Sequence, residues 1–119
     1  MSAWAERLAG LDAEPLGAGL ELRHARRFAE RRKGLAKLDE LPAGVGLRIH
    51  RCNSIHTFGM RFSLDLVWLD RDGRVLRVDR DVPRRRQRLC VRAKSVVEVA
   101  TGGGEEFAAA LRAAAPPGC

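Results

Sequence analysis

Most of the chemically versatile side chains of this sequence gather in one short segment, residues 52–65. The segment reads Cys-Asn-Ser-Ile-His-Thr-Phe-Gly-Met-Arg-Phe-Ser-Leu-Asp and lies between two stretches that have the pattern of strands. A thiol, an imidazole, a guanidinium and a carboxylate so close together can build either a polar binding site or a catalytic one. The candidate ligand-binding residues are Cys52, Asn53, His56, Thr57, Met60, Arg61 and Asp65.

The first interpretation of this segment is a concave binding site. Arg61 would hold an anionic small ligand or an acidic protein surface through charge-assisted hydrogen bonds, and protonation of His56 would tune the affinity. Met60 and the neighbouring phenylalanines would form the wall of the site, or would instead alternate into the core and close the sheet. We favour a binding module, because it requires only a pocket and a partner.

The second interpretation is a hydrolase-like enzyme. His56 and Asp65 would form an oriented His–carboxylate pair, with Cys52 or Ser54 as the nucleophile. No nucleophile motif such as G-x-S-x-G supports this reaction. Asp65 also has a structural alternative, in which its carboxylate accepts backbone N–H groups or pairs with Arg61. The sequence therefore favours a protein without catalytic activity and without a cofactor.

A metal site is the third interpretation. His50, Cys52 and His56 form the pattern H-x-C-x3-H, and Cys90 is a candidate fourth ligand of a tetrahedral zinc ion. His50 and Cys52 would share one face of a strand. The pattern lacks a C-x-x-C pair, and both cysteines also suit small buried core positions. We therefore predict no metal site.

Basic residues concentrate in two windows of the chain. The 22 Lys and Arg residues outnumber 15 Asp and Glu residues, which gives a net charge of +7. Residues 23–37 and residues 84–94 each carry a net charge of +6, so the rest of the chain is acidic. Nucleic-acid binding through these windows is the alternative function. Stacking aromatics are few, Tyr is absent and no nucleic-acid-binding motif occurs, so a basic patch for an anionic ligand or an acidic partner is preferred at Arg84, Arg85, Arg86 and Arg88.

The sequence shows no targeting feature. Its N-terminus lacks the cationic and apolar regions of an export signal, and no apolar stretch is long enough to cross a membrane. Cys52, Cys90 and Cys119 are too few and too far apart for a disulfide framework. We expect a cytoplasmic protein with reduced thiols and no membrane association.

The elements that would position the candidate residues are mostly strands. Alternating or apolar stretches predict strands at residues 20–23, 46–50, 64–70, 75–78 and 95–100. The pair Asp72-Gly73 predicts a hairpin with a two-residue type I′ turn. Short helices are expected near residues 26–36 and near residues 105–114. This pattern predicts a mainly β fold, an antiparallel β-sandwich or a barrel-like domain.

The length and composition fit one domain. With 119 residues and 45% hydrophobic content, the chain can form a single hydrophobic core over residues 1–119. Residues 1–18 are expected to be a lead-in segment, with one or two helical turns over residues 4–8 that Pro15, Gly17 and Gly19 then break. Residues 113–119 are expected to be a flexible tail.

Several of these features together resemble the domain of unknown function 192 family of bacterial and archaeal proteins. The matching stretch covers residues 20–104. It comprises a basic run ending in Gly34-Leu35, then Gly46-Leu47, the string 52–62, Leu64-Asp65, the Asp-Gly hairpin and an apolar strand that holds Glu98. The sequence departs from the family at Ser63, where proline is usual, and in its Ala-rich C-terminal helix. The resemblance implies a mainly β, sandwich-like fold and no established reaction.

Overall fold

The computed structural model of the protein describes residues 2–114 and has eight strands and three short helices. The helices are α1 (Ala3–Leu8), α2 (Phe28–Lys33) and α3 (Gly104–Ala114). The strands are β1 (Asp12–Gly17), β2 (Leu20–Ala25), β3 (Val45–His50), β4 (Ser54–His56), β5 (Leu64–Leu69), β6 (Val75–Val82), β7 (Gln87–Leu89) and β8 (Ser95–Ala100).

Six of the strands form one mixed sheet in the order β1-β2-β3-β8-β5-β6, and β4 and β7 form a separate antiparallel pair. The predicted mainly β fold in one compact unit is confirmed, with a refinement of the expected antiparallel arrangement. β2 and β3 run parallel, because the chain crosses over between them through α2. The described strands do not close into a barrel.

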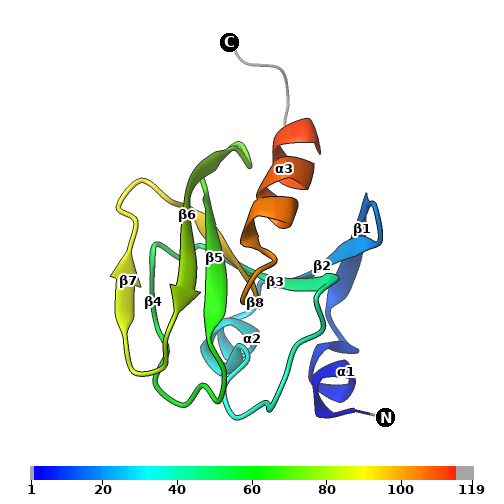
Figure 1. Cartoon of the computed structure of the whole chain (residues 1–119), viewed down its shortest axis with the longest axis vertical. Helices are drawn as coiled ribbons and strands as arrows, with labels where there is room; N and C mark the ends of the chain where they lie inside the picture. Colours follow the sequence, from blue (N-terminus) through cyan, green and yellow to red (C-terminus); the bar gives the residue numbers. More distant parts are fainter. Residues whose placement is uncertain (1, 115–119) are drawn as a thin grey trace.

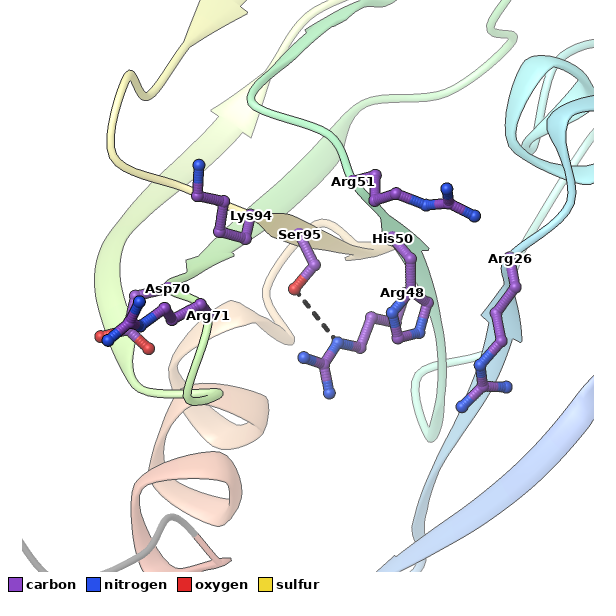
Figure 2. Close-up of a pocket in the computed structure, with 8 residues that line it drawn as sticks. All are labelled: Arg26, Arg48, His50, Arg51, Asp70, Arg71, Lys94 and Ser95. Atoms are coloured by element: carbon purple, nitrogen blue, oxygen red, sulfur yellow. Dashed lines mark hydrogen bonds between the residues drawn. The ribbon is translucent and has the colours of Figure 1, made fainter.

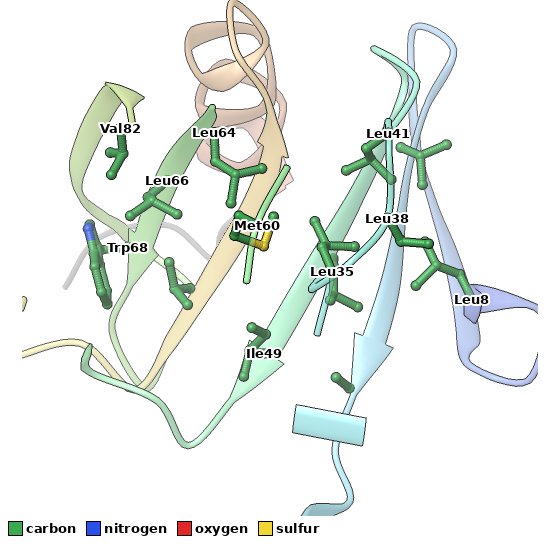
Figure 3. Packing of buried hydrophobic residues seen from close by; sticks show 14 of the residues in the cluster. Leu8, Leu35, Leu38, Leu41, Ile49, Met60, Leu64, Leu66, Trp68 and Val82 are labelled. Atoms are coloured by element: carbon green, nitrogen blue, oxygen red, sulfur yellow. The ribbon is translucent and has the colours of Figure 1, made fainter. Parts of the chain in front are cut away.

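Both faces of the six-stranded sheet are covered (Figure 1). α3 packs on one face, where Phe107 and Leu111 contact a cluster that includes Val97 and Val99 of β8. The opposite face packs against the segment that follows α2, against Met60 and against the β4–β7 pair, as Figure 3 shows for Leu35, Leu38 and Trp68. Side chains that alternate along the central strands therefore enter two separate hydrophobic clusters.

The N-terminal segment contains the expected helical turns and also a strand that the sequence did not predict. α1 covers residues 3–8 and buries Leu8 in the core. Residues 12–17, which the sequence places in the lead-in segment, form β1 at the edge of the sheet. Proline is tolerated in an edge strand, and the pairing register shifts between Pro15 and Gly17. The two residues that suggested an interruption thus mark an edge strand with a bulge.

The hairpin predicted around Asp72-Gly73 joins β5 and β6, but its turn differs from the predicted type. A type I′ turn needs positive φ at both central residues, whereas only Gly73, with φ 82°, has it in this turn. The Asp70 carboxylate accepts N–H bonds from Asp72 and Arg74 at 2.8 and 3.0 Å. This side chain supports a longer turn, so the prediction of a two-residue type I′ turn is wrong.

Both predicted helices are present. α2 lies within the expected range 26–36, and α3 begins one residue before the expected range 105–114. Residues 113 and 114, expected in the flexible tail, belong to α3, and residues 115–119 of that tail lie outside the described residues. Within residues 2–114, no helix has the length and apolar character needed to cross a membrane.

Asp65 ties the sheet to α3. Its side chain is 2% exposed, and it lies on the α3 face of β5. Oδ1 accepts the N–H of Asp81 at 2.8 Å, and Oδ2 accepts the N–H groups of Gly102 and Gly104 at 3.0 and 2.8 Å. A β-carbon at Gly104 would stand 2.9 Å from Oδ2, so this close approach requires glycine. One carboxylate therefore fixes the end of β6 and the start of α3.

We predict that Asp65→Ala lowers the free energy of unfolding by at least about 2 kcal/mol, because three backbone N–H groups lose a charged acceptor. Urea denaturation followed by circular dichroism measures this change. The control is Asp39→Ala, because Asp39 is exposed and its ion pair with Arg61 should contribute no more than about 1 kcal/mol. Equal effects of the two substitutions would refute the role assigned to Asp65.

Trp68 anchors the opposite face of β5. Its ring is fully buried, its Nε1–H donates to Asp79 Oδ2 at 2.9 Å, and the Arg77 guanidinium stands 5.6 Å from its ring centroid. The same Asp79 carboxylate accepts two hydrogen bonds from Arg77. Trp68 on β5 is therefore joined to Arg77 and Asp79 on β6 by packing and by hydrogen bonding.

Trp68→Ala should lower the free energy of unfolding by about 3–5 kcal/mol, because it leaves a large cavity in the core. Phe28→Ala provides the matched aromatic control, since the Phe28 ring is 69% exposed. Thermal unfolding should show a large drop in Tm for the first variant and a small one for the second. A near-wild-type Tm for Trp68→Ala would contradict the core position.

Candidate functional site

Several residues of the predicted site lie apart from one another in the structure. Arg61 is exposed and donates to Asp39 at 2.8 Å. Thr57 is buried, where its hydroxyl donates to the Pro83 carbonyl at 2.7 Å and accepts the Arg86 N–H at 2.8 Å. Asp65 faces α3 on the far side of the sheet. Thr57 and Asp65 thus have their polar groups occupied in holding the backbone.

Three other members of the predicted site share one cleft. Cys52, His56 and Met60 line a cavity of about 210 Å³ between α2 and β4, whereas Asn53 is exposed outside it. We call this cavity the Glu98 cleft. Its lining consists of three α2 cations, a set of apolar side chains and a few polar ones: Arg31, Arg32, Lys33, Gly34, Leu35, Ala36, Ile49, Cys52, Ser54, Ile55, His56, Phe58, Met60 and Glu98.

The arrangement does not assemble the proposed catalytic pair. His56 lies in the Glu98 cleft beside Phe58, with 5.7 Å between the ring centroids. Asp65 is on the opposite face, where backbone N–H groups occupy both carboxylate oxygens. Burial raises the pKa of the Cys52 thiol, which donates to the Ser54 carbonyl. A raised thiol pKa disfavours the thiolate that nucleophilic catalysis requires.

The candidate metal ligands are likewise separated. Cys52 lies in the Glu98 cleft, Cys90 is buried in the core, and His50 points to the other face of β3. Among residues 2–114, no three His, Cys, Asp or Glu side chains come close enough to hold a metal ion. Cys52 and Cys90 are free thiols.

A second pocket, of about 290 Å³, has a strongly cationic lining (Figure 2). It lies on the same face of β3 and β8 as α3, next to the area that this helix covers. We call it the cationic pocket. Five of its eight lining residues are cations and one is an acid: Arg26, Arg48, Arg51, Asp70, Arg71, Lys94, Ser95 and His50. Such a lining attracts anions.

Arg48 is the best-positioned cation of this pocket. It alternates with Leu47 and Ile49 on β3, so the apolar neighbours enter the core and the guanidinium emerges on the opposite face. Its Nε–H donates to Ser95 Oγ on β8 at 3.1 Å, which orients the guanidinium. Burial lowers the pKa of Arg48. No carboxylate of the described residues forms an ion pair with it.

A histidine pair borders the cationic pocket. His50 Nε2 lies 2.8 Å from His24 Nδ1, and His24 Nε2 lies 2.8 Å from Glu14 Oε1. Since the carboxylate accepts, His24 carries its proton on Nε2, and the His50 Nε2–H therefore donates to His24 Nδ1. Burial, together with the charge of Arg48, lowers the pKa of His50 to about 4. His50 is therefore neutral at pH 7.

Only some of the other charged residues of the cationic pocket have a partner of opposite charge or a hydrogen-bond partner. Arg26 forms an exposed ion pair with Asp12 at 2.9 Å. Asp70, the acid of the lining, accepts the two backbone N–H groups of its own turn, and these bonds lower its pKa. Arg51 and Lys94 add cations from the segments that follow β3 and precede β8. The pocket keeps a clear excess of positive charge.

The two basic windows of the sequence contribute differently to this pocket. Arg26 comes from the first window and Lys94 from the second, so the fold brings one residue of each to the same cavity. The predicted patch stands apart, on β7 and on the turn before it, and pairs with no carboxylate of the described residues: Arg84, Arg85, Arg86 and Arg88.

The sequence did not predict the cationic pocket, because its members come from four separate segments of the chain. A usable signal was the polar face of the strand 46–50, where Arg48 and His50 alternate with core residues. Ser95 carried no signal, since its role depends on the β3–β8 register, in which Arg48 lies opposite Val97 and His50 opposite Ser95.

Solved structures with the same fold are known. A protein of unknown function from Novosphingobium aromaticivorans has 21% sequence identity and a TM-score of 0.64, covering 90% of this chain and 89% of its own. A "putative transcription regulator" from Sinorhizobium meliloti has 16% identity and a TM-score of 0.64, with 74% of each chain covered. At these identities, the likeness concerns the fold alone. No curated protein matches the sequence.

A family model described as "Uncharacterized ACR" matches residues 12–110 of this chain. The match begins at β1 and ends within α3, so it includes both the Glu98 cleft and the cationic pocket. It also extends beyond the stretch 20–104 on which the resemblance rested. The chain belongs to the DUF192 family.

Proposed function

We propose that the protein is a binding module for a small anionic ligand, and that the ligand binds in the cationic pocket. The observation that carries this proposal is the Arg48 guanidinium, which is half-buried, oriented by Ser95 and without a carboxylate partner among the described residues. The ligand class is the one that the sequence suggested. The position moves from the segment 52–65 to the opposite face of β3.

The energetics of Arg48 favour an anion at this position. Removing a guanidinium from water is costly unless hydrogen bonds and opposite charge compensate. Ser95 engages only Nε, which leaves the N–H groups of the two terminal nitrogens for a ligand. A carboxylate or phosphate can accept two of these N–H bonds at once. Such a ligand would supply the charge compensation that Arg48 lacks.

The size and setting of the pocket favour a small ligand. About 290 Å³ suits a small molecule or one anionic group of a larger one. Arg26, Arg51, Arg71 and Lys94 line the same pocket as Arg48, so five cations gather around one cavity. Cations gathered around one cavity suit a compact anion better than an extended phosphate backbone.

We predict that sulfate, used as a compact dianion, binds in this pocket and that Arg48→Gln weakens its affinity at least about tenfold, because a charge-assisted contact is lost. NMR titration of the full chain at constant ionic strength measures the affinity. Arg61→Gln is the matched control, since Arg61 belongs to the segment 52–65 and lies outside the pocket. Loss of sulfate binding in Arg61→Gln but not in Arg48→Gln would overturn the proposed position.

The neutral state of His50 leads us to predict that sulfate binding depends on pH. Sulfate keeps its charge between pH 5 and pH 7, whereas a bound dianion favours protonated His50 and raises its pKa from about 4. Binding is therefore coupled to proton uptake, and the affinity for sulfate should rise as the pH falls from 7 to 5.

The same NMR titration at several pH values, repeated with His50→Gln, tests this coupling. Glutamine retains a hydrogen-bond donor for His24 but does not titrate, so the rise in affinity should be reduced or lost. A wild-type affinity that does not change with pH, or an unchanged rise in the variant, would contradict the place of His50 beside the bound anion.

A further inference from the structure

The Glu98 cleft contains a buried carboxyl group without a hydrogen-bond partner. Glu98 lies in the centre of β8, and its side chain is 5% exposed on the face opposite the cationic pocket. Leu47 and Leu66 lie beside it on the neighbouring strands, and no described residue donates a hydrogen bond to it. Burial raises its pKa to about 7. Burying a carboxyl group without a hydrogen-bond partner costs free energy, unless a bound ligand supplies the missing partner.

The cleft gives a ligand access to this carboxyl group. Glu98 lines the cavity, and Gly34 stands above it with φ 49°. A β-carbon at Gly34 would lie 3.9 Å from Glu98 Oε1, at van der Waals contact, so Gly34 lies next to the carboxyl group and any larger side chain there would narrow the cleft.

Arg31 supplies an unsatisfied group of the opposite charge. Its Nε is buried without a hydrogen-bond partner, and only a long bond of 3.4 Å joins its Nη1 to the Arg51 carbonyl. Arg31, Cys52 and Glu98 line the same cavity. Arg32 and Lys33 add two more cations to the same lining.

The charges of Glu98 and of the α2 cations determine which charges a ligand of this cleft should carry. A simple cation would meet Glu98 but would be repelled by the α2 cations, and a simple anion would meet those cations but would be repelled by an ionised Glu98. A zwitterion satisfies both sets of groups. Leu35, Ile49, Ile55 and Met60 form an apolar wall, and the volume of about 210 Å³ limits the ligand to a small molecule.

We propose that the Glu98 cleft binds an α-amino acid with an apolar side chain, with its ammonium group on Glu98, its carboxylate on Arg31 and its side chain against the apolar wall. This site is separate from the cationic pocket, because Glu98 and Ile49 alternate with the residues that face that pocket on β8 and β3. It therefore does not depend on the proposed anion site.

The test uses L-leucine and two analogues that each lack one charge, 3-methylbutylamine and 4-methylpentanoate. NMR titration of the full chain should show leucine shifting the amide resonances of the cleft, with each analogue binding at least about tenfold more weakly. Absence of leucine binding at millimolar concentration would overturn the proposal. Equal binding of leucine and either analogue would overturn the contact assigned to the missing charge.

Two variants assign the contacts. In Glu98→Gln, leucine should lose its advantage over 4-methylpentanoate, because the ammonium contact is gone. In Arg31→Gln, leucine should lose its advantage over 3-methylbutylamine, and this second variant tests the proposal even if the first does not fold. Arg84→Gln, an identical change in an exposed arginine outside the cleft, should leave leucine binding within about twofold of wild type. An unchanged preference for leucine in both test variants would overturn the proposal.

Discussion

The alternation of side chains along β3 and β8 is the constraint on which both candidate sites depend. On β8, Val96 enters one hydrophobic cluster and Val97 and Val99 enter the other, whereas β3 sends Val45, Leu47 and Ile49 into the first cluster and turns Arg48 and His50 to the opposite face. Polar side chains on such strands must either be satisfied internally or open into a cavity. Arg48 and Ser95 open into the cationic pocket on one face, and Glu98 opens into its cleft on the other. The two cavities are thus placed back to back by the period of a β-strand.

Asp65 keeps the two faces in a fixed relation to each other. Its carboxylate holds the backbone where α3 begins and where β6 ends, so the helix that covers one face is fixed to a strand of the sheet. Asp81 has φ 51°, an unfavourable backbone conformation that the bond from its N–H to Asp65 supports. A residue that the sequence marks as a candidate for chemistry therefore has a clear structural role.

The sequence was most informative where local pattern decides structure. The central strands, both helices and the buried Trp68 follow from alternation and hydrophobicity, and residues 64–78 form the expected hairpin. β1 was missed, because its tolerance for Pro15 depends on its being an edge strand, which is a property of the sheet. The candidate site was harder to predict. Residues close in sequence, such as His56, Arg61 and Asp65, point to different surroundings, whereas Arg48, Arg71 and Lys94 meet only through strand order and register.

The structure distinguishes two kinds of basic residue in this chain. Much of the positive charge lies on exposed arginines, but Arg48 is held half-buried beside Ser95 and surrounded by further cations. The most direct test is a crystal structure of the full chain with pyrophosphate. We expect a pyrophosphate group within hydrogen-bond distance of the Arg48 guanidinium and Ser95 Oγ. Pyrophosphate bound only on the exposed Arg84, Arg85 and Arg86, with the cationic pocket empty, would contradict the proposed site.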